Sequence, residues 1–247
     1  MDREAWYLRC RSEDVGDRAI LVGDPGRVDL VASRLEDVRS LNAERGLTTA
    51  TGVRDGHHVT VSAFGMGAPI AAVVLDELHQ LGVRTFLRLG TVMCLEPDAL
   101  GDLVLADAAV RNEATSAAYV PHGYPAAADH ELAAALRQAA ESAGAPLRAG
   151  LVDSSDAFYP SMLHASERHE QLRQLGVLAL DMETSAVLAI GRALGARAAS
   201  LCVATVDART SRKLSAPERV AAEELLVTVG LEALLGVSAP APEGIRL

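Results

Sequence analysis

The sequence predicts an α/β fold in which helices pack around a largely buried sheet. Two observations lead to this prediction. Short apolar runs alternate with stretches of helical periodicity along nearly the whole chain. In addition, 49% of the 247 residues are hydrophobic, which is enough for one sizeable core. Because we find no repeat and no linker, we expect one domain over residues 1–247, with a loosely held proline-rich tail from about residue 237.

Six segments have the length and the apolar or alternating composition of β-strands. The dipeptide Asp55-Gly56, just before the second of them, predicts a tight hairpin turn, because both residues accept positive φ angles. The expected strands cover residues 18–23, 58–64, 85–90, 102–107, 147–153 and 198–205.

Four longer segments have the apolar spacing of helices. Three of them end in a glycine directly after the last apolar position, which is typical of a helix C-terminus. Asp129 stands where its side chain can cap the second helix. The expected helices cover residues 68–82, 129–144, 182–195 and 216–236.

The charge of the chain restricts its partners. With 33 acidic and 23 basic residues the net charge is −10, whereas a protein that binds a nucleic acid needs a basic surface. We therefore expect no nucleic-acid partner. A small phosphate needs only a few local arginines, so the charge does not exclude it.

Targeting, disulfide and metal signals are missing from the sequence. It has no apolar signal region near its start, and no run reaches the ~18 apolar residues of a membrane span. The three cysteines form no CxxC motif, and the seven histidines have no metal-ligand spacing such as HExxH. We therefore expect a cytoplasmic protein without a membrane partner, a disulfide framework or a metal site.

Two glycine-rich segments follow expected strands. In VGDPGRV (22–28), glycine followed by arginine suits a small anion, but this stretch alone favours a plain strand-to-helix turn with a solvated arginine. FGMGAPIAA (64–72) has Ile70 at the third glycine position of a dinucleotide fingerprint, so it fails that motif. An anion or a ribose at the N-terminus of the next helix is the better interpretation.

Charged residues interrupt two other apolar segments. In RTFLRLGT, Arg88 could lie on a sheet edge, pair with a carboxylate, or hold a phosphate together with Gly90 and Thr91. In LDMETSAV, Asp181 and Glu183 could simply be the acids that favour a helix N-terminus. They could equally accept hydrogen bonds from a diol.

Six segments occur along the chain in this order: GDPGRV, NAERGLTTATG, GMGAP, GVRTFLRLGT, SSDAFYP and LDMETSAV. The combination resembles the nucleoside phosphorylases of the uridine/purine phosphorylase family, over about Tyr7 to Leu235. GVRTFLRLGT and SSDAFYP are most similar to the uridine phosphorylase branch. The resemblance implies a single-domain three-layer α/β/α sandwich with a mixed central sheet. It also implies a homo-oligomer built from dimers, for which we expect a hexamer.

The resemblance assigns the phosphate site. It implies that Gly23, Arg27, Arg88 and Thr91 hold phosphate, and that a neighbouring subunit supplies Arg45. Three guanidinium groups around one dianion can bind it, orient it beneath C1′ of the sugar and exclude water as the nucleophile. Inorganic phosphate would then be the co-substrate, and no cofactor is expected.

The resemblance also implies the contacts to the nucleoside sugar. Met182 and Glu183 match its ribose contacts, with Glu183 accepting from the 2′ and 3′ hydroxyl groups. Tyr7 replaces the histidine that a neighbouring subunit lends to the 5′ end of the sugar. Phe158 matches the aromatic residue that packs beside the base and the sugar.

The base-binding positions depart from the family pattern. Met162 and His164 stand where the uridine branch has a glutamine and an arginine that contact uracil. In an ungapped comparison with the purine branch, Arg219 falls on its arginine, but Val206 falls on its aspartate and Asp207 lies one residue beyond. A shift of one residue in a strand turns a side chain to the other face. These positions therefore leave open whether the base is a pyrimidine or a purine.

Three further residues complete the expected base site, namely Val92, Met93 and Asp181. The family normally has glycine at the position of Met93, so we expect a reshaped and more apolar base pocket.

The resemblance implies phosphorolysis, in which a nucleoside and phosphate give a free base and α-ribose 1-phosphate. Positioning and electrostatics would supply the catalysis. The alternatives are a purine or 5′-modified nucleoside phosphorylase, a nucleosidase that uses water, and a catalytically silent nucleoside-binding subunit. The expected catalytic residues are Arg88, Glu183, Asp207 and Arg219.

Overall fold

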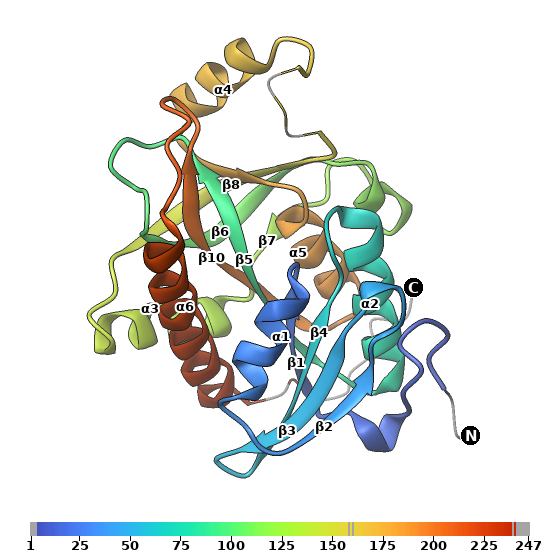
Figure 1. The fold of residues 1–247 in the computed structure, drawn as a ribbon. Helices are drawn as coiled ribbons and strands as arrows, with labels where there is room; N and C mark the ends of the chain where they lie inside the picture. Colours follow the sequence, from blue (N-terminus) through green and yellow to red (C-terminus); the bar gives the residue numbers. More distant parts are fainter. Residues whose placement is uncertain (1–3, 158, 160, 239, 241–247) are drawn as a thin grey trace.

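The computed structural model describes residues 4–157, 159, 161–238 and 240. Within this part of the chain, ten strands form one mixed sheet and helices pack on both of its faces (Figure 1). The predicted α/β class with a mixed central sheet is therefore confirmed. Phe158 and most of the proline-rich tail lie outside the described residues, so the expectations placed on them stay expectations.

The strands run in the order β10-β6-β8-β9-β5-β1-β4-β3-β2, and β7 pairs with β6. Because β5 pairs with β10 as well as with β9, the strands β5, β10, β6, β8 and β9 close into a ring. The strands are β1 (Arg18–Val22), β2 (Glu36–Asn42), β3 (Thr49–Arg54), β4 (His57–Ala63), β5 (Thr85–Cys94), β6 (Leu103–Asn112), β7 (Ala126–Ala127), β8 (Leu147–Ser155), β9 (Val177–Asp181) and β10 (Arg197–Asp207).

The helices divide the core into two halves. Buried side chains of α2 and α5 pack with Ala19 and Leu21 of β1, and those of α1, α3 and α6 pack with Ile20 and Val22. Since neighbouring residues of a strand point to opposite faces, these two clusters lie on opposite sides of the sheet. The helices are α1 (Pro25–Ala32), α2 (Ala68–Leu81), α3 (His130–Ser142), α4 (Ala165–Gln174), α5 (Thr184–Ala193) and α6 (Ala216–Gly236).

All six strands and four helices expected from the sequence are confirmed, although several ends differ. The hairpin is confirmed as well, with φ angles of 50° at Asp55 and 77° at Gly56. Asp129 caps α3, since its Oδ1 accepts a hydrogen bond from the Leu132 amide at 3.0 Å. Among the described residues, no helix is both long enough and apolar enough to cross a membrane.

Six elements lie outside the segments expected from the sequence, and their composition explains several of them. The strand β2 lies at the end of the sheet and is mostly exposed, so its sequence EDVRSLN has no apolar pattern. The helix α4, with the sequence ASERHEQLRQ, buries only Ala165 and Leu172. It lies at one end of the molecule, away from the other helices (Figure 1). Elements that bury little surface leave little periodicity in a sequence. The elements outside the expected segments are β2, β3, β7, β9, α1 and α4, of which β3 is the strand that the predicted hairpin implies.

Four strands bring their carboxyl ends to one edge of the sheet. The strands β4, β1, β5 and β10 are parallel neighbours in that order. In open α/β sheets, ligands bind in the crevice outside the carboxyl ends of such strands. The motif glycines Gly23 and Gly65 follow the ends of β1 and β4 at this edge.

Candidate active site

A cavity of about 540 Å³ opens at the carboxyl edge of the parallel strands. Eight of the residues expected in the site line it, from the glycine of the first motif to the arginine of α6. The lining also includes seven residues outside the expected site residues, of which Gly90 was named beside Thr91 as a possible phosphate contact. The expected residues are Gly23, Arg27, Arg88, Thr91, Asp181, Met182, Glu183 and Arg219, and the others are Asp24, Pro25, Gly65, Met66, Gly90, Thr205 and Glu223.

The first motif forms one wall of this cavity. The loops after β1 and β4 touch, since the Gly65 amide donates to the Gly23 carbonyl at 3.0 Å. A Cβ on Gly23 would lie 2.9 Å from the Gly65 carbonyl oxygen, so a side chain there would separate the two loops. Asp24 then caps α1 by accepting from the Gly26 amide at 2.9 Å. The helix therefore begins at the cavity and presents Arg27 in its first turn.

Arg27 is held rigidly although it lies in a binding cavity. It is 4% exposed, its Nη1 donates to the Leu89 carbonyl at 3.2 Å, and its Nη2 donates to Glu223 at 2.9 Å. Its Nε has no hydrogen-bond partner among the described residues. A charged and incompletely satisfied guanidinium group at the start of a helix is suited to an anion.

Arg88 reaches the same cavity from the opposite face of the sheet. Its Nη2 lies 2.6 Å from the Glu183 carboxylate and 3.1 Å from that of Asp181. Its Nη1 points to the Cys202 sulfur, and its guanidinium group lies directly over Gly90. Burial by itself would lower the pKa of Arg88, but Cys202 and the two carboxylates outweigh burial and raise it. The group therefore stays charged.

Glu183 joins the arginine to the loop before α2. Its Oε1 accepts from the Gly67 amide at 2.6 Å, its Oε2 accepts from Arg88, and the residue is 5% exposed. A carboxylate has about four lone-pair sites, so Glu183 can accept two more hydrogen bonds. A sugar diol is a ligand that could donate them.

Asp181 has a different position from Glu183, although both were indicated by one motif. It accepts from the Ser154 hydroxyl and from the Thr184 hydroxyl, each at 2.5 Å, and from the Thr184 amide at 3.1 Å. With Arg88 beside it, its oxygens are engaged by the protein. Asp181 therefore holds Arg88 and the start of α5 in place, and we do not assign it to base binding.

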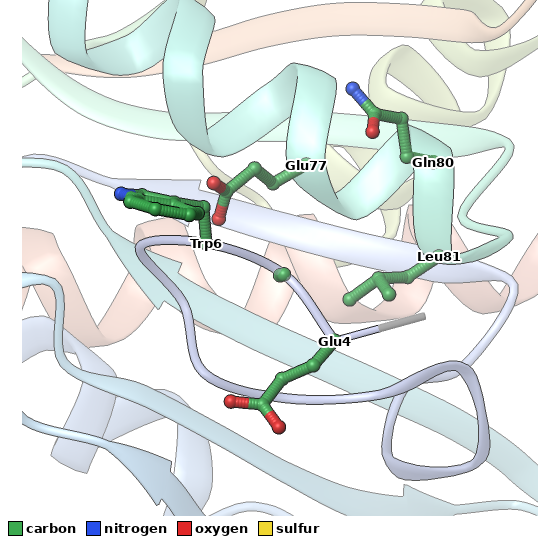
Figure 2. A pocket seen from close by; sticks show the side chains of 6 residues that line it. Glu4, Trp6, Glu77, Gln80 and Leu81 are labelled. Atoms are coloured by element: carbon green, nitrogen blue, oxygen red, sulfur yellow. The ribbon is translucent and has the colours of Figure 1, made fainter. Parts of the chain in front are cut away.

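Tyr7 and Arg45 do not line the cavity. They contact each other on the surface, with the Arg45 Cζ atom 5.6 Å from the centre of the Tyr7 ring. The turn that bears Tyr7 is fixed to α2, because Glu77 accepts from the Tyr7 and Leu8 amides, each at 2.9 Å. Figure 2 shows Glu77 beside this turn, next to the exposed Trp6. The pair is thus held on the surface of the protein.

Several expected base-binding residues also lie outside the cavity wall. Met93 packs against a small apolar cluster of Leu95, Leu172, Val177 and Leu180 and is not among the residues that line the cavity. Val92 is buried, and Val206 pairs with Met93 across the sheet. Met162 and His164 belong to the segment before α4 and do not line the cavity.

The contacts of Asp207 do not suit a general acid, which must donate a proton. Its Oδ1 accepts from the Arg209 amide at 2.8 Å and from the Thr210 amide at 3.1 Å. Burial tends to raise the pKa of Asp207, but these amides outweigh it and lower the pKa. Asp207 therefore stabilises a turn in its ionised form, and we do not assign it a catalytic role. A register shift between Ala204 and Val206 accompanies Thr205, which lines the cavity instead.

Arg219 and Glu223 lie one turn apart on α6 and both line the cavity. The guanidinium group of Arg219 is exposed and has no ion-pair partner among the described residues. Glu223 was missed by the sequence analysis, because an acid on a largely polar helix face is indistinguishable from a solvated one. Its only sequence signal is the four-residue spacing from Arg219.

The Phosphorylase superfamily is the protein family whose pattern matches residues 17–228 of this chain. The chain is 34% identical to a uridine phosphorylase of Thermococcus kodakarensis over 230 residues, which are 88% of this chain and 82% of the relative. It is 36% identical to a guanosine phosphorylase of Halorubrum lacusprofundi over 202 residues, covering 81% and 82%. It is 34% identical to a uridine phosphorylase of Escherichia coli over 208 residues, covering 79% and 82%.

Proposed function

Because this chain belongs to the Phosphorylase superfamily, we propose that it cleaves the N-glycosidic bond of a nucleoside with inorganic phosphate. The products are a free base and α-ribose 1-phosphate. The observation that supports this best is the pairing of two buried arginines, Arg27 and Arg88, with the buried acid Glu183 in one cavity. An anion and a polyhydroxylated sugar can be held side by side there.

The phosphate occupies the side of the cavity formed by the strand ends. Arg27 and Arg88 attract the dianion, and the Gly23 backbone and the Thr91 hydroxyl complete the cradle. One phosphate oxygen attacks C1′ while the bond from C1′ to the base nitrogen breaks. The base leaves with the bonding electron pair and takes up a proton from solvent or from a nearby donor. The balance of the step needs no cofactor.

The ribose lies over Met182, with its 2′ and 3′ hydroxyl groups donating to Glu183. In this transition state the sugar resembles an oxocarbenium ion, as in other glycosidic cleavages. The phosphate beneath the ring and the fixed carboxylate beside it stabilise that positive charge. Catalysis then rests on positioning and on charges that are already oriented.

Arg219 is placed to act on the base. It lines the cavity from α6 and has no ion-pair partner among the residues described here. Its guanidinium group can stabilise the negative charge that develops on the departing base. An exposed arginine without an ion-pair partner among the described residues suits bases of different shape, and relatives of this chain include phosphorylases named for uridine and for guanosine.

A nucleoside screen with and without inorganic phosphate tests the proposal. We expect base release that depends on phosphate, with ribose 1-phosphate formed in equal amount. Uridine, guanosine, inosine and 5′-modified nucleosides are assayed in parallel at equal concentration. Base release at the same rate without phosphate would indicate a nucleosidase, and binding without release would indicate a silent nucleoside-binding protein. Either result would contradict the proposal.

We also propose a homo-oligomer, with a hexamer of three dimers as its form. This is supported by the position of Tyr7 and Arg45 on the surface and outside the cavity, where a neighbouring subunit can take them into its own site. One isologous interface would exchange both residues between two subunits. Sedimentation of the active enzyme is expected to show a species of at least two chains. A fully active monomer would contradict this expectation.

A further inference from the structure

An ion pair between Arg27 of α1 and Glu223 of α6 lies in the wall of the cavity. Arg27 Nη2 lies 2.9 Å from Glu223 Oε1, and the two side chains are 4% and 18% exposed. These residues are 196 positions apart in the sequence, so only the fold brings them together. Neither the sequence motifs nor the mechanism above gives Glu223 a role.

The contacts of Arg27 fix both the place and the plane of its guanidinium group. Its Nη1 is bonded to the Leu89 carbonyl and its Nη2 to Glu223. A planar guanidinium group held at two nitrogens cannot rotate about its own axis. Leu89 directly precedes Gly90 and Thr91 of β5, so the group is fixed against the strand that also forms the phosphate cradle.

The removal of Glu223 would affect Arg27 in two ways. Arg27 is 4% exposed and its Nε has no hydrogen-bond partner among the described residues, so without Glu223 its Nη2 would also lack an acceptor and the guanidinium group would tend to move toward water. The remaining bond to Leu89 is a single contact, about which the guanidinium plane can turn. Both effects move the N–H donors of Arg27 away from the position of the bound phosphate.

We propose that Glu223 is a positioning residue for phosphate binding. It acts through Arg27, whose orientation it fixes, and it does not touch the phosphate. This inference rests on the proposed function, since it deepens the account of the same site. The negative charge of Glu223 opposes a bound dianion, so the gain from orienting Arg27 must exceed that repulsion. The hydrogen-bond acceptor is therefore the essential property of the side chain, more than its charge.

Two substitutions separate the acceptor from the charge. Glu223→Gln keeps an oxygen acceptor and loses the charge, whereas Glu223→Ala loses both. For Glu223→Ala we expect kcat/KM for phosphate to fall by about tenfold or more, because a hydrogen bond to a charged group is lost. For Glu223→Gln we expect a value within about threefold of the unchanged protein. The nucleoside KM at saturating phosphate should stay unchanged in both.

A double-mutant cycle tests whether Glu223 acts through Arg27. We expect Arg27→Ala and the double variant Arg27→Ala/Glu223→Ala to have the same kcat/KM for phosphate, taken from the initial slope. Glu224→Ala is the matched control, because Glu224 is exposed on the same helix one residue further on. It should behave as the unchanged protein, and thermal melting of all variants reports on folding.

Binding of inorganic phosphate alone, measured by titration calorimetry, separates this inference from the proposed function. We expect Glu223→Ala to weaken binding and Glu223→Gln to preserve it. Phosphate binding without nucleoside cleavage would contradict the proposed function, and the binding series would still test the role of Glu223. The inference is overturned if Glu223→Ala binds phosphate normally, if Glu223→Gln is as impaired as Glu223→Ala, or if the two losses in the double variant add.

Discussion

Arg88→Ala is expected to lower kcat/KM for phosphate by about 10²- to 10³-fold, the effect of removing a donor that stabilises the transition state. The arginine is 4% exposed and also neutralises the buried carboxylates of Asp181 and Glu183. The substitution therefore removes an anion ligand and leaves two acids without a counter-charge. Steady-state kinetics with phosphate and nucleoside varied separately measure the effect.

Two companion variants keep this experiment informative. Arg88→Lys retains a positive charge beside the two acids, so it should fold even if the alanine variant does not, while losing the planar fork. Arg137→Ala removes a surface arginine that pairs with Asp107 and is 43% exposed, and it should leave activity unchanged. If Arg88→Lys and Arg88→Ala showed the phosphate dependence of the unchanged protein, Arg88 would have no role in phosphate binding.

Gly90→Ala is the second substitution with a large expected effect. An added Cβ would lie 2.1 Å from Nη1 and 2.6 Å from Cζ of Arg88, far inside van der Waals contact. The guanidinium group must then leave Glu183, and the strand that holds it is buried and cannot shift easily. We expect a loss in kcat/KM for phosphate close to that of Arg88→Ala, and a destabilisation of about 1–3 kcal/mol.

Gly123→Ala is the matched control for the glycine substitution. A Cβ at Gly123 would meet no atom within 4 Å, so stability and activity should stay unchanged. Chemical denaturation and phosphate kinetics of both variants give the comparison. If Gly90→Ala retained full activity, the position of Arg88 over Gly90 would not be needed for catalysis.

Local signals predicted the cavity's strand-end residues well. Gly23 and Arg27 follow an apolar strand, and Arg88 interrupts another, so each was visible as a departure from a regular pattern. The sequence also left open that Arg88 pairs with a carboxylate, and the structure shows that it does. Such residues are conspicuous because burial of a charge within a strand is costly unless the charge has a partner or a ligand.

Residues whose role depends on distant neighbours were beyond sequence reasoning. Glu223 differs from a solvated acid only because α1 presents Arg27 opposite it. Asp207 looked like a candidate acid until its turn showed that backbone amides bind it. Met93 packs against an apolar cluster that includes residues of α4 and β9, two elements outside the expected segments. The contacts that decide the roles of these residues come from short or polar segments, whose sequences carry no clear pattern.

The closed ring of strands has a consequence for how the protein is made. The ring cannot close before β10 pairs with β5 and β6, and β10 ends at Asp207 of a 247-residue chain. Such pairings between distant segments are slow to form, because the chain entropy is lost before the contacts are gained. During synthesis, the N-terminal strands emerge first, and their edges stay unpaired until the later strands are made. Unpaired strand edges make a partly folded chain prone to aggregation. Arg88 therefore cannot meet Asp181, Glu183 and Cys202 until most of the chain has left the ribosome, and a product truncated before α6 would lack both Arg219 and Glu223.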